Sequence, residues 1–266
     1  MSEFPVSGPI TAEIRVGAGR VQVTGAPGAT VATAVVEPLD DSDLARDCAA
    51  RTVVEMRGDR LYVKTPEIAT GWLRRRSASV AITVTVPTGS SLELKAASAD
   101  VTVTGELRKA DVTSASGDLS IERITEQLSV NTASGDLRAG AVGGDLKVIS
   151  ASGDITVDTV DGHASLHSAS GDFHIGSAGN GVRANTASGD VMVGVLRRGA
   201  AKVTSASGDI RIGVAPGTGV WQDLHSMSGR TRSELDPAGP PTGGGEPEVT
   251  LQLRSMSGDV TLGRFA

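Results

Sequence analysis

One acidic residue recurs along the chain at a fixed spacing, and a carboxylate so repeated could bind cations or hold turns. A small residue precedes each of these Asp residues, usually in a Ser-Gly-Asp turn. They are Asp100, Asp118, Asp136, Asp154, Asp172 and Asp190, each 18 residues after the last, then Asp209 after a one-residue insertion near Gly199, and finally Asp259. Such regularity predicts one carboxylate for each repeat of the fold.

Two roles are open to this ladder of carboxylates. Calcium-binding β-rolls have a nine-residue period, but their Gly-Gly-x-Gly-x-Asp repeat supplies several oxygens to each ion, whereas this repeat offers one Asp and one Ser. In a turn, Gly accepts a positive φ and Asp caps the backbone two residues on. Stacked carboxylates would repel by roughly 1 kcal/mol per pair in water, which a turn tolerates. We therefore predict structural turns, and no metal or cofactor.

Other residues that could do chemistry are not arranged for it. The four histidines occupy different positions of the repeat, and none has a Cys, Glu or second His at ligand spacing, so we predict solvated His163, His167, His174 and His225. Many Ser residues precede Gly, but none lies in G-x-S-x-G, and no phosphate-binding loop or dinucleotide fingerprint is present. The sequence predicts no catalytic residue.

The elements that carry the Asp residues show a finer period of 9. Counting from Asp118, apolar residues occupy positions 2, 4 and 7, which are Leu119, Ile121 and Ile124; in the next nonad they are Leu128, Val130 and Ala133. The same rule gives Ala164, Leu166 and Ala169 in the nonad that begins at His163. Positions 2 and 4 lie on one side of a strand, and position 7 points inward if the chain bends between them. Each nonad is therefore predicted to be a strand and a corner.

A single nonad cannot bury its apolar side, but stacked units can bury it in a shared core. We therefore predict an all-β fold, a single-stranded β-solenoid with 18 residues per coil. A run of hairpins is the rival, but it would leave positions 2, 4 and 7 without a common interior. Propeller blades usually need 40 or more residues.

Composition and periodicity divide the chain into three regions. Residues 1–90 are predicted to form irregular β coils with a short helix at about 40–51, turns at 16–20 and 25–29, and strands at 53–56, 61–64 and 80–86. Residues 91–213 form the regular repeats, and 214–266 form degenerate coils with a loop rich in Pro and Gly at about 235–248, between the last two strands. Only 2% of residues are aromatic, so Val, Ile, Leu and Ala must build the core.

Charge and the ends of the chain restrict the location and the partners. The net charge is −6 with scattered Lys and Arg, which excludes a nucleic-acid-binding protein. Cys48 is the single cysteine, so it forms no intramolecular disulfide and is expected to fill a short buried element. The N-terminus lacks the pattern of a signal peptide, and no segment has the length of a transmembrane span. We expect a cytoplasmic protein.

One basic and aromatic segment is unusual in this acidic chain. It consists of Trp72, Leu73, Arg74, Arg75 and Arg76. Such residues favour interfaces, so the segment could contact a protein partner, an acidic polymer or a membrane surface. The alternative is a solvated loop with Trp72 folded onto the body.

The repeated T/S-A-S-G-D turn, the opening ITAEIRVGAGRVQVTG and the closing SMSGDVTLG resemble the bacterial adhesin-like family of β-strand-repeat proteins known as DUF4097. The resemblance covers nearly the whole chain. It implies a β-helical module, and the adhesin label implies surface attachment, but it implies no enzymatic residue.

These observations favour a non-catalytic structural or interaction protein that acts as a scaffold or binds a protein partner. The alternatives are an adhesin that binds a wall or host ligand and a carbohydrate-active β-helix enzyme. The enzyme would need a cleft with paired acids and basic residues on one face, and the uniform Ser, Thr and Asp ladders disfavour it.

The C-terminal end predicts self-association. The strand at 259–262 is followed by four residues, too few to cover a final rung. Because natural proteins protect exposed strand edges, we expect the loop at 235–248, Phe265 or a second molecule to cover it. We favour a dimer or short oligomer.

Overall fold

The computed structural model describes residues 1–66, 78–235 and 248–264. The chain forms two compact units, Met1–Gly135 and Asp136–Ala266. The basic and aromatic segment (Trp72 to Arg76), most of the loop rich in Pro and Gly, and Phe265 lie outside the described residues.

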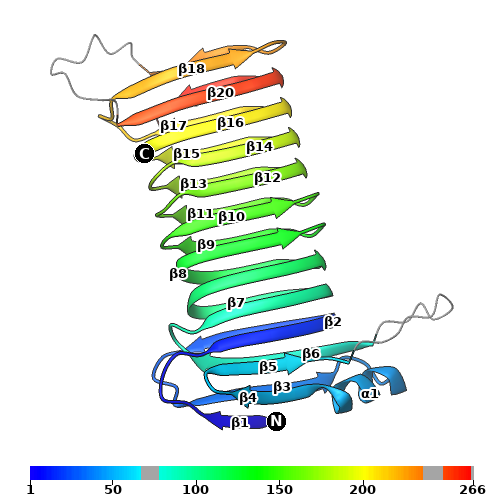
Figure 1. Cartoon of the computed structure of the whole chain (residues 1–266). Helices are drawn as coiled ribbons and strands as arrows, with labels where there is room; N and C mark the ends of the chain where they lie inside the picture. Colours follow the sequence, from blue (N-terminus) through cyan, green and yellow to red (C-terminus); the bar gives the residue numbers. More distant parts are fainter. Residues whose placement is uncertain (67–77, 236–247, 265–266) are drawn as a thin grey trace. The chain divides into compact units, whose positions relative to one another are not determined.

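The second unit is built from strands that pair in parallel, one coil apart (Figure 1). One column runs in the order β9, β11, β13, β15, β17, β21 and β19, with bounds Leu137–Val142, Ile155–Val160, Phe173–Ala178, Val191–Leu196, Ile210–Val214, Val260–Gly263 and Thr231–Ser233. The other runs β10, β12, β14, β16, β20 and β18, with bounds Asp145–Ser150, Ala164–Ser170, Val182–Ser188, Gly199–Ser207, Val249–Ser257 and Val220–Ser226.

The register of these pairs confirms the coil length that the repeat predicts. Leu137 lies beside Ile155, and Ile155 lies beside Phe173, so each of these steps along the column is one 18-residue repeat. The prediction of a β-solenoid with two strands per coil is therefore confirmed.

The first unit combines parallel coils with antiparallel strands at one end. The long strand β2 (Thr11–Ala26) pairs in parallel with β5 (Arg60–Lys64) and β6 (Ser79–Pro87) on one side and with β7 (Ser91–Ser116) on the other, and β7 pairs with β8 (Leu119–Thr132). Three further strands form antiparallel pairs. They are β1 (Ser2–Pro5), which pairs with β3 (Val31–Pro38); β3, which also pairs with β6; and β4 (Val53–Arg57), which pairs with β5. The predicted strands at 53–56, 61–64 and 80–86 are confirmed.

One predicted turn in this unit is wrong. Residues 16–20 do not interrupt the chain, because β2 continues through them as one bent strand. Gly19 has a φ of +127° and lies so close to the backbone of Val80 that no Cβ would fit. A glycine therefore bends the strand at a corner of the coil without ending it.

The inward positions 2 and 4 are buried as predicted, but position 7 differs between the two halves of a repeat. Ile124 is fully buried, whereas Ala133 and Ala169 are exposed. In the second half the residue before the alanine points inward instead, and Thr132 is buried.

A hydrogen bond explains why a Ser or Thr takes the inward place. In the five repeats from Ser114 to Thr186 this hydroxyl donates to the carbonyl two residues on, so a polar side chain can be buried at the corner. The pairs are Ser114 with Ser116 (3.0 Å), Thr132 with Ser134 (2.9 Å), Ser150 with Ser152 (2.9 Å), Ser168 with Ser170 (2.6 Å) and Thr186 with Ser188 (3.1 Å). The prediction that alanine fills the corner is therefore wrong for this half of the repeat.

The predicted helix is present as α1, Asp43–Arg51. It begins at Ser42, whose hydroxyl accepts the backbone N–H of Ala45 at 3.1 Å, and it packs against β3 and β6. Its buried residues are Ala45 and Cys48, and burial raises the pKa of the Cys48 thiol. No helix in the described residues has the length and apolarity that a membrane span requires.

The order of strands at the end of the second unit corrects an expectation. The last strands of the sequence, β20 and β21, lie inside the stack, between the coil of β16 and β17 and the coil of β18 and β19 (Figure 1). The segment at 259–262 is therefore not an end rung. The end coil is β18 and β19, where Gln222 and Ser233 occupy positions that are apolar in the next coil and hydrogen-bond to each other at 3.0 Å.

Candidate functional site

The first unit carries a face of alternating acidic and basic side chains, which we call the charged face. It is formed by Glu13 and Arg15 of β2, Arg60 of β5, and Glu93 and Lys95 of β7. The register places Glu13 beside Glu93, and Arg15 beside Lys95. Their side chains point outward because they alternate with buried apolar residues on the same strands.

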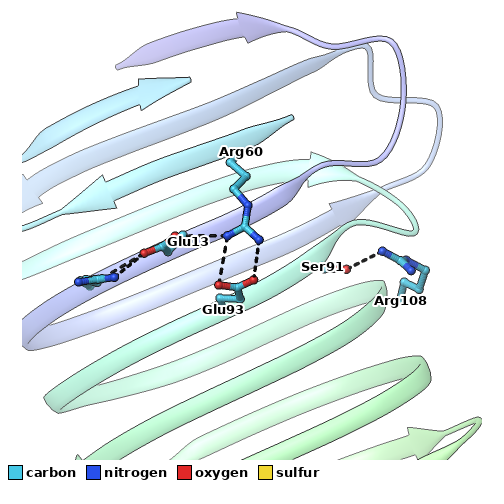
Figure 2. Close-up of polar contacts among 6 residues, drawn as sticks. Glu13, Arg60, Ser91, Glu93 and Arg108 are labelled. Atoms are coloured by element: carbon cyan, nitrogen blue, oxygen red, sulfur yellow. Dashed lines mark hydrogen bonds and ion pairs between the residues drawn. The ribbon is translucent and has the colours of Figure 1, made fainter. Parts of the chain in front are cut away.

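Arg60 joins the two acidic side chains of this face. Its guanidinium lies 3.4 Å from Glu13 Oε2, and it donates to both oxygens of Glu93 at 3.3 and 3.2 Å (Figure 2). Two carboxylates side by side in a sheet would repel, and the shared guanidinium removes that penalty. The hydrogen bond to Glu93 raises the pKa of the Arg60 guanidinium.

Arg15 binds the other oxygen of Glu13, because its guanidinium donates two hydrogen bonds to Oε1, at 2.8 and 3.1 Å. Each of the four carboxylate oxygens of Glu13 and Glu93 therefore accepts from a guanidinium. The side chain of Glu13 is 15% exposed, whereas that of Glu93 is 47% exposed. The pair of acids is held in fixed positions at the surface, with opposite charges beside it.

Two shallow pockets adjoin on this face. One, of about 350 Å³, is lined by Glu13, Arg15, Glu93, Lys95, Asp111 and Thr113 together with core residues. The other, of about 450 Å³, extends over β4 and β5 to Tyr62, with Arg57 lying 5.3 Å from its ring centre. The charged face thus presents acidic and basic groups together, and one aromatic ring lies beside it.

These residues were not predicted from the sequence because Glu13 and Glu93 are not related by the 18-residue repeat. A signal was available in two similar pentapeptides, AEIRV at residues 12–16 and LELKA at residues 92–96. Both place an acidic and a basic residue on the outer side of a strand, so aligning them would have predicted a mixed-charge face.

The Asp ladder lies on a different edge of the coils. In the first unit, Asp100 Oδ1 accepts the backbone N–H of Asp118 at 3.1 Å. In the second unit Oδ1 of each Asp accepts the N–H of the Asp one coil along the stack, in the pairs Asp136 with Asp154 (3.0 Å), Asp154 with Asp172 (2.9 Å), Asp172 with Asp190 (2.8 Å), Asp190 with Asp209 (2.8 Å) and Asp209 with Asp259 (2.8 Å).

This geometry corrects the expected capping of the backbone two residues on. Each carboxylate caps the neighbouring coil instead, and Asp259 extends the ladder to the N–H of Arg230 in the end coil at 2.9 Å. A hydrogen bond to a carboxylate is stronger than a neutral one and offsets the repulsion along the ladder. The glycines of these turns have positive φ, as predicted.

The histidines lie on the outer side of strands or in turns, and His163, His174 and His225 are exposed. His167 is half-buried, with Nδ1 3.3 Å from the Asn185 amide. Within the described residues, no group of three or more His, Cys, Asp or Glu side chains is placed to hold a metal ion.

Comparison with known proteins agrees with this architecture. The Toastrack DUF4097 family matches residues 45–263. The chain belongs to this family. None of the curated proteins matches the chain, so membership in the DUF4097 family indicates the fold but no activity.

Two solved structures show how the DUF4097 fold recurs. A "putative lipid binding protein" from Parabacteroides distasonis has a TM-score of 0.57 and 16% identity, and the match covers 98% of this chain and 95% of that one. A "putative adhesin" from Bacteroides fragilis has a TM-score of 0.50 and 16% identity, with the same coverage. At this identity the likeness establishes the fold alone.

Proposed function

We propose that this chain is a non-catalytic binding protein, structural or scaffolding in character, which recognises a protein partner through the charged face of its first unit. One observation carries the proposal. Every carboxylate oxygen of Glu13 and Glu93 is engaged by Arg15 or Arg60. A general acid or nucleophile needs an oxygen free to act on a substrate, whereas a recognition surface needs charges held in place.

The charged face also has the paired acids and nearby basic residues that a carbohydrate-active enzyme needs, since they share one pocket. The ion pairs favour binding over catalysis. Arg60 lies against both acids, where a glycosidase would hold the sugar and the attacking water. Binding is therefore the better account of this pocket.

The test compares three baits in affinity capture from the native host. Glu13→Gln with Glu93→Gln neutralises the acids without changing their shape, and Glu3→Gln with Glu37→Gln removes the same charge from exposed positions of the same unit. We expect a protein that the wild type and the control retain and the first variant loses by at least tenfold, about 1.4 kcal/mol.

Identical captures by all three baits would contradict recognition through the charged face. Unfolding of the Glu13/Glu93 variant is checked separately by its melting temperature, which we expect to stay close to that of the wild type because both amides can still accept from Arg60.

An adhesin is the second candidate, favoured by the name of the Bacteroides fragilis neighbour. The two functions differ in location, since we propose a cytoplasmic site for the scaffold and an adhesin must reach the cell surface. Fractionation of the native host decides between them, with the protein expected among cytoplasmic proteins or on the inner membrane surface. Recovery from the cell wall or the medium would favour the adhesin.

A further inference from the structure

A second surface, on the β10 to β18 column of the second unit, combines basic residues with exposed apolar ones. We call its outward cations Lys147, Arg183, Lys202 and Arg254 the basic face. Register places Lys147 beside Ser165, Ser165 beside Arg183, and Arg183 beside Lys202, so the first three share one row across the coils. All four are exposed.

This row carries a net positive charge in a chain whose total is −6. Lys147, Arg183 and Lys202 form no ion pair within the described residues. The six strands carry two acidic side chains, and both are engaged: Asp145 accepts the His163 N–H at 2.9 Å, and Asp223 lies 3.6 Å from Arg254. Three cations are therefore available to an anionic partner.

Large apolar side chains lie beside this row and are open to water. Four large apolar residues of the second unit are exposed, with exposed fractions of 39% for Ile149, 48% for Trp221, 69% for Met227 and 58% for Met256. Ile149 and Trp221 are on the same strands as the basic face, and the two methionines occupy the corner at the ends of β18 and β20. Exposed apolar residues along one face of a sheet favour an interaction site.

A shallow groove of about 540 Å³, more open to solvent than the pockets of the charged face, runs along this corner across successive coils and is lined by Ile149, His167, Ala169, Ala187, Ala206 and Met256 among others. Its hydroxyls at Ser150, Ser168 and Thr186 donate within their own turns, so their protons are not available to a ligand. Ser205 also lines the groove, is 1% exposed, and holds the one buried side-chain oxygen without a hydrogen-bond partner in the described residues.

We propose that this surface binds an anionic lipid bilayer. The basic face would contact the phosphates, Trp221, Met227 and Met256 would enter the interfacial layer, and the groove would accept an acyl chain. Trp is favoured at the depth of lipid headgroups, and basic residues gain energy near an anionic leaflet. A soluble polyanion would use the cations but gain nothing from the apolar side chains, so the combination favours a lipid surface.

The test uses the full chain with vesicles of phosphatidylglycerol and phosphatidylcholine at low salt, and with phosphatidylcholine alone. We expect binding to the anionic vesicles only. Lys147→Ala with Arg183→Ala and Lys202→Ala should weaken it by on the order of a hundredfold. The matched control, Arg138→Ala with Arg211→Ala and Arg232→Ala, removes three cations from the other column of strands and should retain most of the affinity.

Fluorescence locates the contact. The chain has two tryptophans, so Trp72→Phe leaves Trp221 as the single reporter, and we expect brominated lipids to quench it. Met227→Ser with Met256→Ser should weaken vesicle binding but leave binding to soluble polyglutamate unchanged.

Absence of vesicle binding, equal losses in the two triple variants, or a Trp221 signal that brominated lipid does not change would each overturn the proposal. Equal affinity for polyglutamate with no effect of the methionine substitutions would assign the surface to a soluble polyanion instead. The site is in a different unit from the charged face, so its failure would leave the capture result standing.

Discussion

Gly171→Ala is expected to lower the free energy of unfolding by about 3 kcal/mol or more. Gly171 has a φ of +109°, and a Cβ built on it would lie 2.2 Å from the carbonyl oxygen of Gly153 in the adjacent coil. The backbone conformation alone costs about 1–2 kcal/mol for alanine. The contact adds to this cost because the atom in the way is backbone, which can move only if the coils separate.

Substitutions at two other glycines of the same unit distinguish the cost of the positive φ from the cost of the backbone contact. Gly217 has a φ of +80° with nothing within 4 Å of a Cβ, so Gly217→Ala should cost about 1–2 kcal/mol. Gly219 has neither feature, and Gly219→Ala should be close to neutral. Denaturant unfolding followed by circular dichroism measures all three. If Gly171→Ala behaved like Gly219→Ala, the turns would not be stacked as described.

Leu253→Ala is expected to cost about 2–5 kcal/mol, and Leu224→Ala clearly less, about 1 kcal/mol. Leu253 is fully buried because β20 lies between β16 and β18, with Val203 and Leu224 as its register partners. Leu224 occupies the same position in the end coil and is only half-buried. Truncation of a side chain already in contact with water loses less transfer free energy and leaves a smaller cavity.

The ranking of these two variants tests the order of the coils. Stacking in the order of the sequence would make Leu224 internal and Leu253 terminal, and Leu224→Ala would then be the more damaging substitution. Equal losses would mean that neither coil is at the end of the unit.

The regular part of the fold could be predicted because its cause is local and repeated. From Asp118 onward each Asp turn has a Gly with positive φ, and each strand needs apolar residues two apart, so the same nine-residue rule recurs at Asp118 and Asp190. Because the same period recurs several times in the sequence, stacked coils are the arrangement that buries all of the repeated apolar positions.

Three features depended on contacts between distant residues and could not be predicted in this way. Ala133 was predicted to point inward because it is apolar. Thr132 is buried instead, because its hydroxyl donates a hydrogen bond to the nearby carbonyl of Ser134. The coil of β20 and β21 is the last in the sequence but lies inside its unit, and no feature of its sequence predicts which strands it pairs with. The ion pairs that Arg60 forms with Glu13 and Glu93 join residues 47 and 33 positions apart, outside the period of the repeat.

Successive repeats lie directly over one another, and each row of side chains described above depends on that register. Disulfide formation tests it in a Cys48→Ala background. Ser165→Cys with Arg183→Cys joins register partners on β12 and β14, about 4.8 Å apart in backbone, which is within disulfide range. We expect this pair to oxidise readily in the folded chain, and the pair Ser165→Cys with Asn185→Cys, displaced by two residues, to remain reduced. Oxidation of the displaced pair with none in the register pair would contradict the solenoid.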